Sequence, residues 1–151
     1  TIWQRFLELF PDKYPEPELI FATTDAQMRA AGLSFQKAGY IRNIAEFSKN
    51  QGLDHKKLDA MDDDALVEYL VQIKGVGRWT VEMLLMFSLG REDVFPVDDL
   101  GIQNGMMALY GLKPGNKKEL YALMRKRAEK WRPYRSLACM YIWQYKDAIK
   151  K

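Results

Sequence analysis

Apolar residues recur at helical spacing in nearly every segment of this chain, and no segment shows the sustained alternation of a half-buried strand. The last predicted helix begins after Pro133. Its predicted buried stripe follows the i, i+3, i+4 rule and consists of Tyr134, Leu137, Ala138, Tyr141, Ile142, Tyr145 and Ile149. A length of 151 residues suits one domain. We therefore predict a single all-α domain over residues 1–151, built of roughly eight to ten short helices.

Cysteine and histidine are too scarce for several classes of site. The single cysteine, Cys139, excludes an internal disulfide and a cysteine-ligated zinc or iron–sulfur site within the chain. The single histidine, His55, excludes a metal centre built on several imidazoles, and we interpret it as a solvated loop residue. No stretch has the length of a membrane span, and no secretory signal is visible. A lone cysteine suits a reducing compartment, so we expect a cytoplasmic (nucleoid) protein if bacterial and a nuclear one if eukaryotic.

The two ends of the sequence differ in character. The chain begins at Thr1, and TIWQRFLELF has the pattern of a helix already under way, with no room for a full N-terminal cap. We therefore expect an N-terminal truncation. The net charge is only +3, but nine Lys/Arg face two acids between residues 113 and 135. This basic segment is either a surface for a polyanion or a solvated helix face.

The segment IKGVGR, residues 73–78, separates two apolar helices within residues 62–89. Two glycines one residue apart allow a tight turn and leave backbone N–H groups uncovered. Because the next helix begins at once, these groups and the helix N-terminus form an anion site of the kind that binds phosphate. Lys74 and Arg78 add positive charge beside it. The pattern favours nucleic-acid binding, and the alternative is a simple helix break.

Two further features flank this turn in the sequence. Asp98 and Asp99 follow Pro96 and precede a helix, so one of them would be its N-cap and the other would be free to lie beside the turn. Trp79 opens a helix over residues 80–89 that is apolar on almost all sides, and we expect that helix in the middle of the fold. Trp143 lies away from the predicted stripe of the last helix, so it either packs in the core or lines a cavity.

The run LVQIKGVGRWTVEMLLMFSLGREDVFPVDDLGIQNGM resembles the signature of the helix-hairpin-helix base-excision DNA glycosylases, the HhH-GPD superfamily. The segments MRAAGLSFQKAGYI and WRPYRSLACMYIWQY also resemble this family, most closely its monofunctional 3-methyladenine DNA glycosylases. The resemblance implies the HhH-GPD fold and hydrolysis of the N-glycosidic bond of alkylated purines (3-methyladenine, 7-methylguanine) in base excision repair. The partner would be double-stranded DNA containing alkylated bases, bound by a monomer that flips the damaged base out of the stack and contacts no membrane.

The same resemblance assigns roles to residues. Asp99 would stabilise the oxocarbenium-like transition state and position water, and Asp98 would be the better cap. Family members that also cleave the strand carry a nucleophilic lysine where this chain has Trp79, so no Schiff base is expected. The base pocket would be lined by Trp79, Trp143, Met83 and Leu100. The DNA phosphate would be bound by Lys74, Gly75, Val76, Gly77 and Arg78.

The resemblance implies no required cofactor and no iron–sulfur cluster. A structural Na⁺ or K⁺ ion would be held by the backbone carbonyls of Val71, Ile73 and Val76. Two alternatives stay open. One is a non-catalytic helix-hairpin-helix DNA-binding module, and the other is a glycosylase of the same fold that acts on deaminated or oxidised bases.

Overall fold

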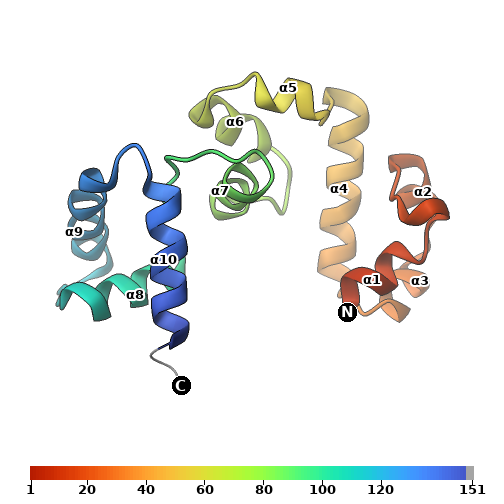
Figure 1. Ribbon diagram of the computed structural model, residues 1–151. Coiled ribbons are helices and arrows are strands. Elements are labelled where there is room, and N and C mark those ends of the chain that lie inside the picture. Colours follow the sequence, from red (N-terminus) through yellow and green to blue (C-terminus); the bar gives the residue numbers. More distant parts are fainter. Residues whose placement is uncertain (149–151) are drawn as a thin grey trace. The chain divides into compact units, whose positions relative to one another are not determined.

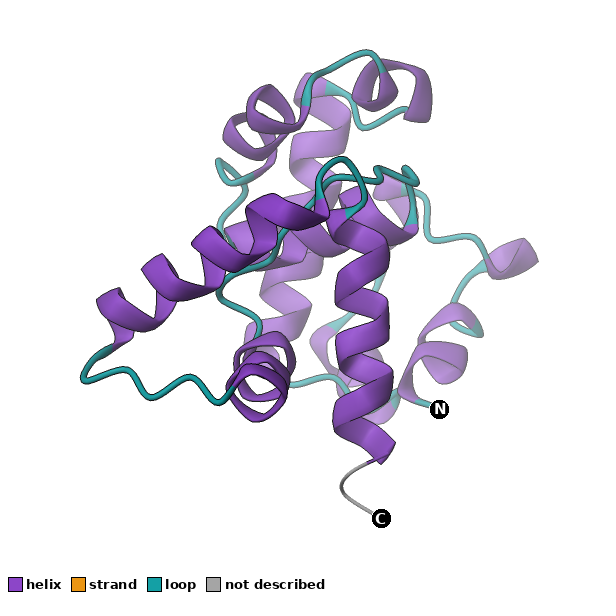
Figure 2. Ribbon diagram, turned by 60° about the vertical axis from the view of Figure 1, so that its left-hand side comes forward, coloured by secondary structure: helices purple, strands orange, loops and turns teal. Residues whose placement is uncertain are grey.

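The computed structural model describes residues 1–148, so Ile149 lies outside the described residues. Every regular element in residues 1–148 is a helix: ten α-helices and two short 3-10 helices (Figure 2). The predicted fold class and number of helices are therefore confirmed. The chain forms two compact units, Thr1–Gly77 and Arg78–Lys151 (Figure 1). That they make up one domain stays a prediction.

The first unit contains six α-helices and one 3-10 helix. Side-chain caps fix the starts of several of them: Thr24 and Gln27 form a capping box, Ser34 caps the longest helix, and Asp62 caps the last. The elements are α1 (Ile2–Leu7), η1 (Pro11–Lys13), α2 (Pro17–Ala22), α3 (Asp25–Ala30), α4 (Phe35–Gln51), α5 (His55–Asp59) and α6 (Asp63–Leu70).

Two predictions for this unit were wrong. Helix α1 does have a cap, because the Thr1 hydroxyl accepts from the Gln4 N–H at 3.2 Å and the Gln4 side chain accepts from the Thr1 amino group at 2.9 Å. His55 is exposed, as predicted, but it opens helix α5 instead of lying in a loop, because Asp54 caps that helix. One core cluster of the unit consists of Phe6, Phe10, Ile20, Met28, Ala31, Leu33, Ala38 and Ala45.

The first unit ends in the turn over residues 71–77, which has the conformation that its glycines suggest. Gly75 adopts a φ of +103°, and a Cβ built on it would lie 2.2 Å from Cδ1 of Tyr40. The Asn43 side-chain amide donates to the carbonyl of Lys74 at 2.8 Å. Helix α4 therefore supports the turn through an aromatic ring and one hydrogen bond.

The second unit contains α7 (Arg78–Phe87), α8 (Leu100–Tyr110), α9 (Lys117–Ala128), η2 (Glu129–Trp131) and α10 (Arg135–Ala148). Helices α8 and α10 pack directly on each other, and Gly105 makes that approach close: a Cβ there would lie 2.4 Å from Cγ2 of Ile142 (Figure 1). No helix within residues 1–148 is both long and apolar enough to cross a membrane.

The predicted stripe of α10 was largely wrong. The buried residues of α10 are Ser136, Cys139 and Ile142, whereas Tyr134 and Tyr141 are exposed. This face of α10 packs on α8, where Ile142 lies beside Gly105, and Ser136 forms two hydrogen bonds with the connector before α8. The Ser136 hydroxyl donates to the Arg91 carbonyl at 2.7 Å and accepts from the Val94 N–H at 2.9 Å.

Helix α7 also differs from the expected all-round apolar helix. Its one acidic side chain, Glu82, is buried, while Phe87 is exposed. Burial raises the pKa of Glu82, and the Arg78 guanidinium, which donates to Oε1 at 3.1 Å, only partly offsets this. Within residues 1–148, the buried Oε2 atom of Glu82 has no hydrogen-bond partner. Glu82 therefore holds a proton to higher pH than an ordinary glutamate does.

Replacing Gly75 by alanine should destabilise the first unit by about 2–4 kcal/mol, because alanine is strained at this φ and its methyl group would overlap Tyr40. The matched control is Gly39→Ala in α4, where a Cβ meets nothing within 4 Å. That change should stabilise the protein by about 0.5–1 kcal/mol. Urea unfolding measures both values, and a Gly75→Ala variant as stable as the wild type would contradict this account of the turn.

Replacing Glu82 by glutamine should remove a pH dependence of stability. A carboxyl whose folded pKa is raised stabilises the protein fully below the unfolded value, near 4.5, and that contribution is lost as pH rises through the folded pKa. The stability of Glu82→Gln relative to the wild type should therefore rise with pH above about 4.5 and then level off. Urea unfolding from pH 4 to 8 tests this, with the exposed Glu8→Gln as control. A constant difference between wild type and Glu82→Gln across that range would refute it.

Candidate functional site

The carboxylate of Asp99 lies at the N-terminus of α8 and caps that helix. Its Oδ1 atom accepts from the Ile102 N–H at 2.7 Å. The prediction that Asp98 is the better cap was wrong, because Asp98 is bound elsewhere. The Tyr121 hydroxyl donates to its Oδ1 atom, and the Lys117 ammonium lies 3.8 Å from the same atom. Helix α9 therefore holds Asp98, and Asp99 is left to cap α8.

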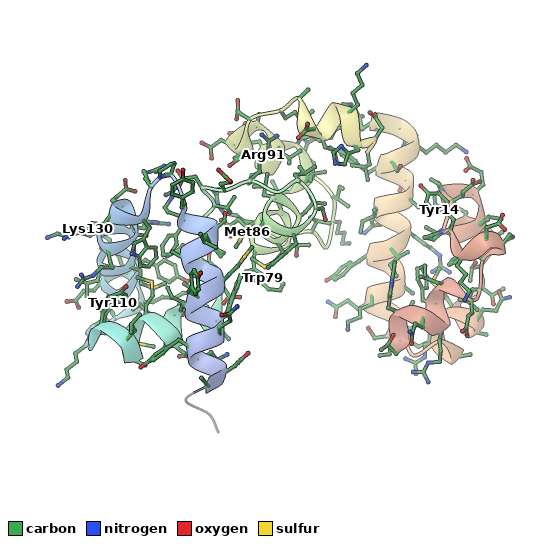
Figure 3. The ribbon with its side chains drawn as sticks, viewed as in Figure 1. Tyr14, Trp79, Met86, Arg91, Tyr110 and Lys130 are labelled. Carbon is green, nitrogen blue, oxygen red and sulfur yellow. The ribbon has the colours of Figure 1, made fainter. Side chains whose placement is uncertain are left out.

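Two tryptophan side chains converge on Asp99. The Trp79 indole N–H, from the start of α7 (Figure 3), donates to Oδ2 at 2.9 Å. The Trp143 indole N–H, from α10, donates to Oδ1 at 2.8 Å. Trp79 is 46% exposed and Trp143 is half-buried, so neither is an ordinary core residue. Three helices of the second unit thus meet at one carboxylate.

The pKa of Asp99 follows from this arrangement. Burial by itself raises it, but hydrogen bonds from the Trp143 indole, the Ile102 amide, the Trp79 indole and the Gly101 amide outweigh burial and lower the pKa below its ordinary value. In residues 1–148 no lysine or arginine pairs with Asp99, so neutral donors stabilise the charge. Asp99 is therefore ionised at neutral pH.

Aromatic and apolar side chains border this carboxylate. Trp79, Met83 and Phe87 are spaced by four residues and share one face of α7. The Phe87 ring stacks on the Trp143 ring with centroids 5.9 Å apart, and Phe87 is 60% exposed. Leu100, directly after Asp99, is 71% exposed. Of the predicted pocket residues, Trp79 and Trp143 thus contact Asp99, while Met83 shares a helix face with Trp79 and Leu100 follows Asp99 in the chain; their role in binding a base stays a prediction.

Phe87 is a candidate pocket residue that the sequence analysis did not select. Its position eight residues after Trp79 and four after Met83 places it on their face of α7, and that spacing is visible in the sequence. Tyr40 and Asn43, which support the turn from α4, were also not selected. Tyr40 lies 35 residues before Gly75 and Asn43 lies 31 residues before Lys74, and nothing in the local sequence pairs them with the turn.

The turn itself presents backbone and basic groups. Lys74, Gly75 and Gly77 are exposed. The Val76 N–H is not available to a ligand, because it already donates to the Ile73 carbonyl at 2.9 Å. Arg78 opens the second unit, and its guanidinium binds Glu82. Among residues 1–148, no three His, Cys, Asp or Glu side chains gather to hold a metal ion.

The basic segment over residues 113–135 serves the fold as well as the surface. Arg135 donates to Oδ1 of Asp93 at 2.6 Å, and Arg132 binds both Asp93 and Glu129. Arg127 lies over the Tyr110 ring, 4.4 Å from its centroid. Its last two arginines thus hold the connector before α8, a role that neither interpretation included, and both interpretations stay predictions for the rest of the segment.

Comparison with known proteins agrees with this geometry. The family model described as the HhH-GPD superfamily base excision DNA repair protein matches residues 1–133. The chain is 42% identical over 147 residues to DNA-3-methyladenine glycosylase 1 of Schizosaccharomyces pombe, a match that covers 95% of this chain and 63% of that protein. A curated relative from Bacillus subtilis is 32% identical, and the match covers 95% of this chain and 51% of the relative. The chain thus spans about half to two thirds of these relatives.

Two solved structures have the same fold. The structure of S. pombe 3-methyladenine DNA glycosylase (Mag1) in complex with abasic DNA aligns with a TM-score of 0.83 at 39% identity, covering 95% of this chain and 69% of that one. A DNA-3-methyladenine glycosidase from Bacillus halodurans aligns with a TM-score of 0.79 at 37% identity, covering 96% of this chain and 65% of that one. The chain belongs to the HhH-GPD superfamily of base excision DNA repair proteins.

Proposed function

We propose that this chain is the catalytic region of a monofunctional DNA glycosylase, which hydrolyses the N-glycosidic bond of alkylated purines in double-stranded DNA. The observation that carries the proposal is the Asp99 carboxylate, held ionised by two indole N–H groups and bordered by exposed aromatic rings. The similarity to DNA-3-methyladenine glycosylases supports the choice of substrate, and the solved structure of one of them on abasic DNA supports DNA as the partner.

The chemistry needs little more than a well-placed negative charge. A purine methylated at N3 or N7 carries a positive charge and is a good leaving group, so it departs with the electron pair of the C1′–N bond. The sugar that remains is an oxocarbenium-like cation. Asp99 would stabilise that cation electrostatically and accept a proton from the water that attacks C1′. The products are free base and an abasic site.

The faces of three aromatic rings would recognise the damaged base. Two of them, Trp79 and Trp143, also donate their indole N–H groups to Asp99, and the third is Phe87. The target nucleotide has to leave the stack before Asp99 can reach C1′. A cationic base stacked on Trp79, Phe87 or Trp143 gains about 0.5–2 kcal/mol over a neutral one by cation–π attraction. Met83 and Leu100 would complete the pocket as apolar walls.

Trp79 and the turn bear on two further properties of the proposed enzyme: whether it cleaves the DNA strand, and how it binds the DNA backbone. An indole at residue 79 cannot form a Schiff base, so the DNA strand would stay intact after the base leaves. The turn over residues 71–77 would bind a DNA phosphate through the backbone N–H groups of its exposed glycines, Gly75 and Gly77, and through the charges of Lys74 and of Arg78 directly after it.

We also propose a site for a monovalent cation at this turn. The carbonyls of Val71, Ile73 and Val76 follow the end of α6 at Leu70, and the Ile73 carbonyl also accepts the Val76 N–H at 2.9 Å. Neutral carbonyl oxygens of this kind suit Na⁺ or K⁺ better than a multivalent ion. A bound ion would add positive charge near the phosphate.

Replacing Asp99 by asparagine should lower the rate of base release by about 10²–10⁴-fold, since the charge is lost. Asparagine is an equally good N-cap, so α8 should still begin at this residue. Its one oxygen cannot accept from both indoles, however, so urea unfolding should show a loss of stability beside the loss of rate. The matched control is Asp98→Asn, which removes the same charge one residue away and should keep most of the rate. Single-turnover release of methylated purine from duplex DNA measures both.

The outcomes separate the candidate functions. Base release by the wild type with intact strands, lost only in Asp99→Asn, is the result we expect. DNA binding without base release by the wild-type chain would indicate a non-catalytic binding module and would overturn the proposal for these 151 residues.

Replacing Lys74 by alanine should weaken DNA binding equally for damaged and undamaged duplexes. One phosphate contact fewer reduces the slope of log K against log salt by about one. Lys49→Ala is the control, because Lys49 is exposed on α4 and pairs with Glu18 at 3.3 Å. Fluorescence anisotropy from 50 to 300 mM salt tests the prediction. An unchanged slope in Lys74→Ala would remove this residue from the interface.

A further inference from the structure

Gly101, the second residue of α8, occupies a position where its backbone does not require glycine. Its φ is outside the left-handed region, and it is buried. Glycine is unfavourable inside a helix compared with almost any other residue. A glycine at this position therefore has a local cost in stability that some other interaction must offset.

The surroundings of Gly101 identify that interaction. A Cβ built on Gly101 would lie 2.8 Å from Cδ1 and 2.9 Å from Nε1 of Trp143, and 2.9 Å from Oδ1 of Asp99. These distances are shorter than real Cβ contacts. Nε1 and Oδ1 are the donor and the acceptor of the 2.8 Å hydrogen bond between α10 and the carboxylate. A side chain at residue 101 would thus overlap both ends of that bond.

We propose that Gly101 is a positioning residue: the absence of a side chain lets the Trp143 indole reach Asp99 and orient its carboxylate for reaction. The role of Asp99 in this statement rests on the proposed function. The Gly101 N–H acts in the same direction, because it is one of the four donors that lower the pKa of Asp99. Gly101 therefore contributes through a backbone donor and through the space that it leaves.

The other titratable groups around Asp99 do not replace this interaction. From α10, the Cys139 thiol is neutral, since burial raises its pKa to about 12. From α7, Glu82 has a raised pKa and binds Arg78. Asp98 is held by Tyr121 and Lys117 of α9. None of these groups can stabilise the negative charge of Asp99 in place of an N–H donor. The loss of a donor should therefore raise the pKa of Asp99.

The test compares Gly101→Ala with Trp143→Phe, which keeps an aromatic ring but removes the N–H donor. Both should lower the single-turnover rate of base release at least tenfold with little change in DNA affinity. Both should also raise the pKa of Asp99, measured by ¹³C NMR of its carboxyl group and by the acid limb of the pH–rate profile. The double variant should be no worse than either single one, because both remove the same bond.

Gly105→Ala is the matched control, since it lies in the same helix and its Cβ would meet Ile142 of the same partner helix. It should lower thermal stability and leave the pKa of Asp99 and the pH–rate profile unchanged. An equal pKa shift in Gly105→Ala would overturn the proposal, because the effect would then come from helix packing alone. A wild-type pKa and rate in Gly101→Ala would also overturn it.

The NMR titration keeps this inference separate from the proposed function. If the wild-type chain releases no base, the pKa of Asp99 in Gly101→Ala still decides whether residue 101 controls the indole–carboxylate bond. If Gly101→Ala does not fold, Trp143→Phe decides alone, because it leaves Gly101 in place. A pKa of Asp99 unchanged in Trp143→Phe would overturn the proposal.

Discussion

The hydrogen bonds to one carboxylate connect the chemistry of this protein to its fold. Asp99 accepts from α7 through Trp79, from α10 through Trp143 and from the backbone of α8, which it caps. Burial opposes its ionisation, and these donors together prevail. The side chains that set the charge of the site therefore also hold three helices together, so the site and the packing of the second unit depend on the same contacts.

Helix starts depend on local signals, because an N-cap involves residues only three positions apart. Thr24, Ser34 and Asp62 all cap the helices that follow them. The buried face of α10 could not be predicted in this way. It packs on α8 and on the connector before it, and the Ser136 partners in that connector, Arg91 and Val94, lie more than 40 residues earlier in the chain. Periodicity shows that a helix has an apolar stripe but not which neighbour that helix meets.

In the candidate site, too, some residues could be found from local motifs and others depend on contacts with distant parts of the chain. The glycine turn and the pair of acids were found from their motifs, but the choice of cap depended on Tyr121 and Lys117, which come from another helix. Phe87 could have been predicted from the sequence, because its spacing places it on the same face of α7 as Trp79 and Met83. Gly101 could not be found from the sequence. Its importance is that it has no Cβ atom beside the indole of Trp143, and Trp143 lies 42 residues later in the chain.

The burial of the Cys139 thiol affects how readily alkylating agents react with the protein. Thiolates, and not thiols, react readily with alkylating agents. Burial raises the pKa of Cys139 to about 12, so the group is a neutral thiol at pH 7, and the side chain is fully buried. Reagents that methylate DNA would therefore find the only sulfhydryl group of the folded chain almost inert. The packing of α10 therefore protects this sulfur atom from modification as long as the helix stays folded.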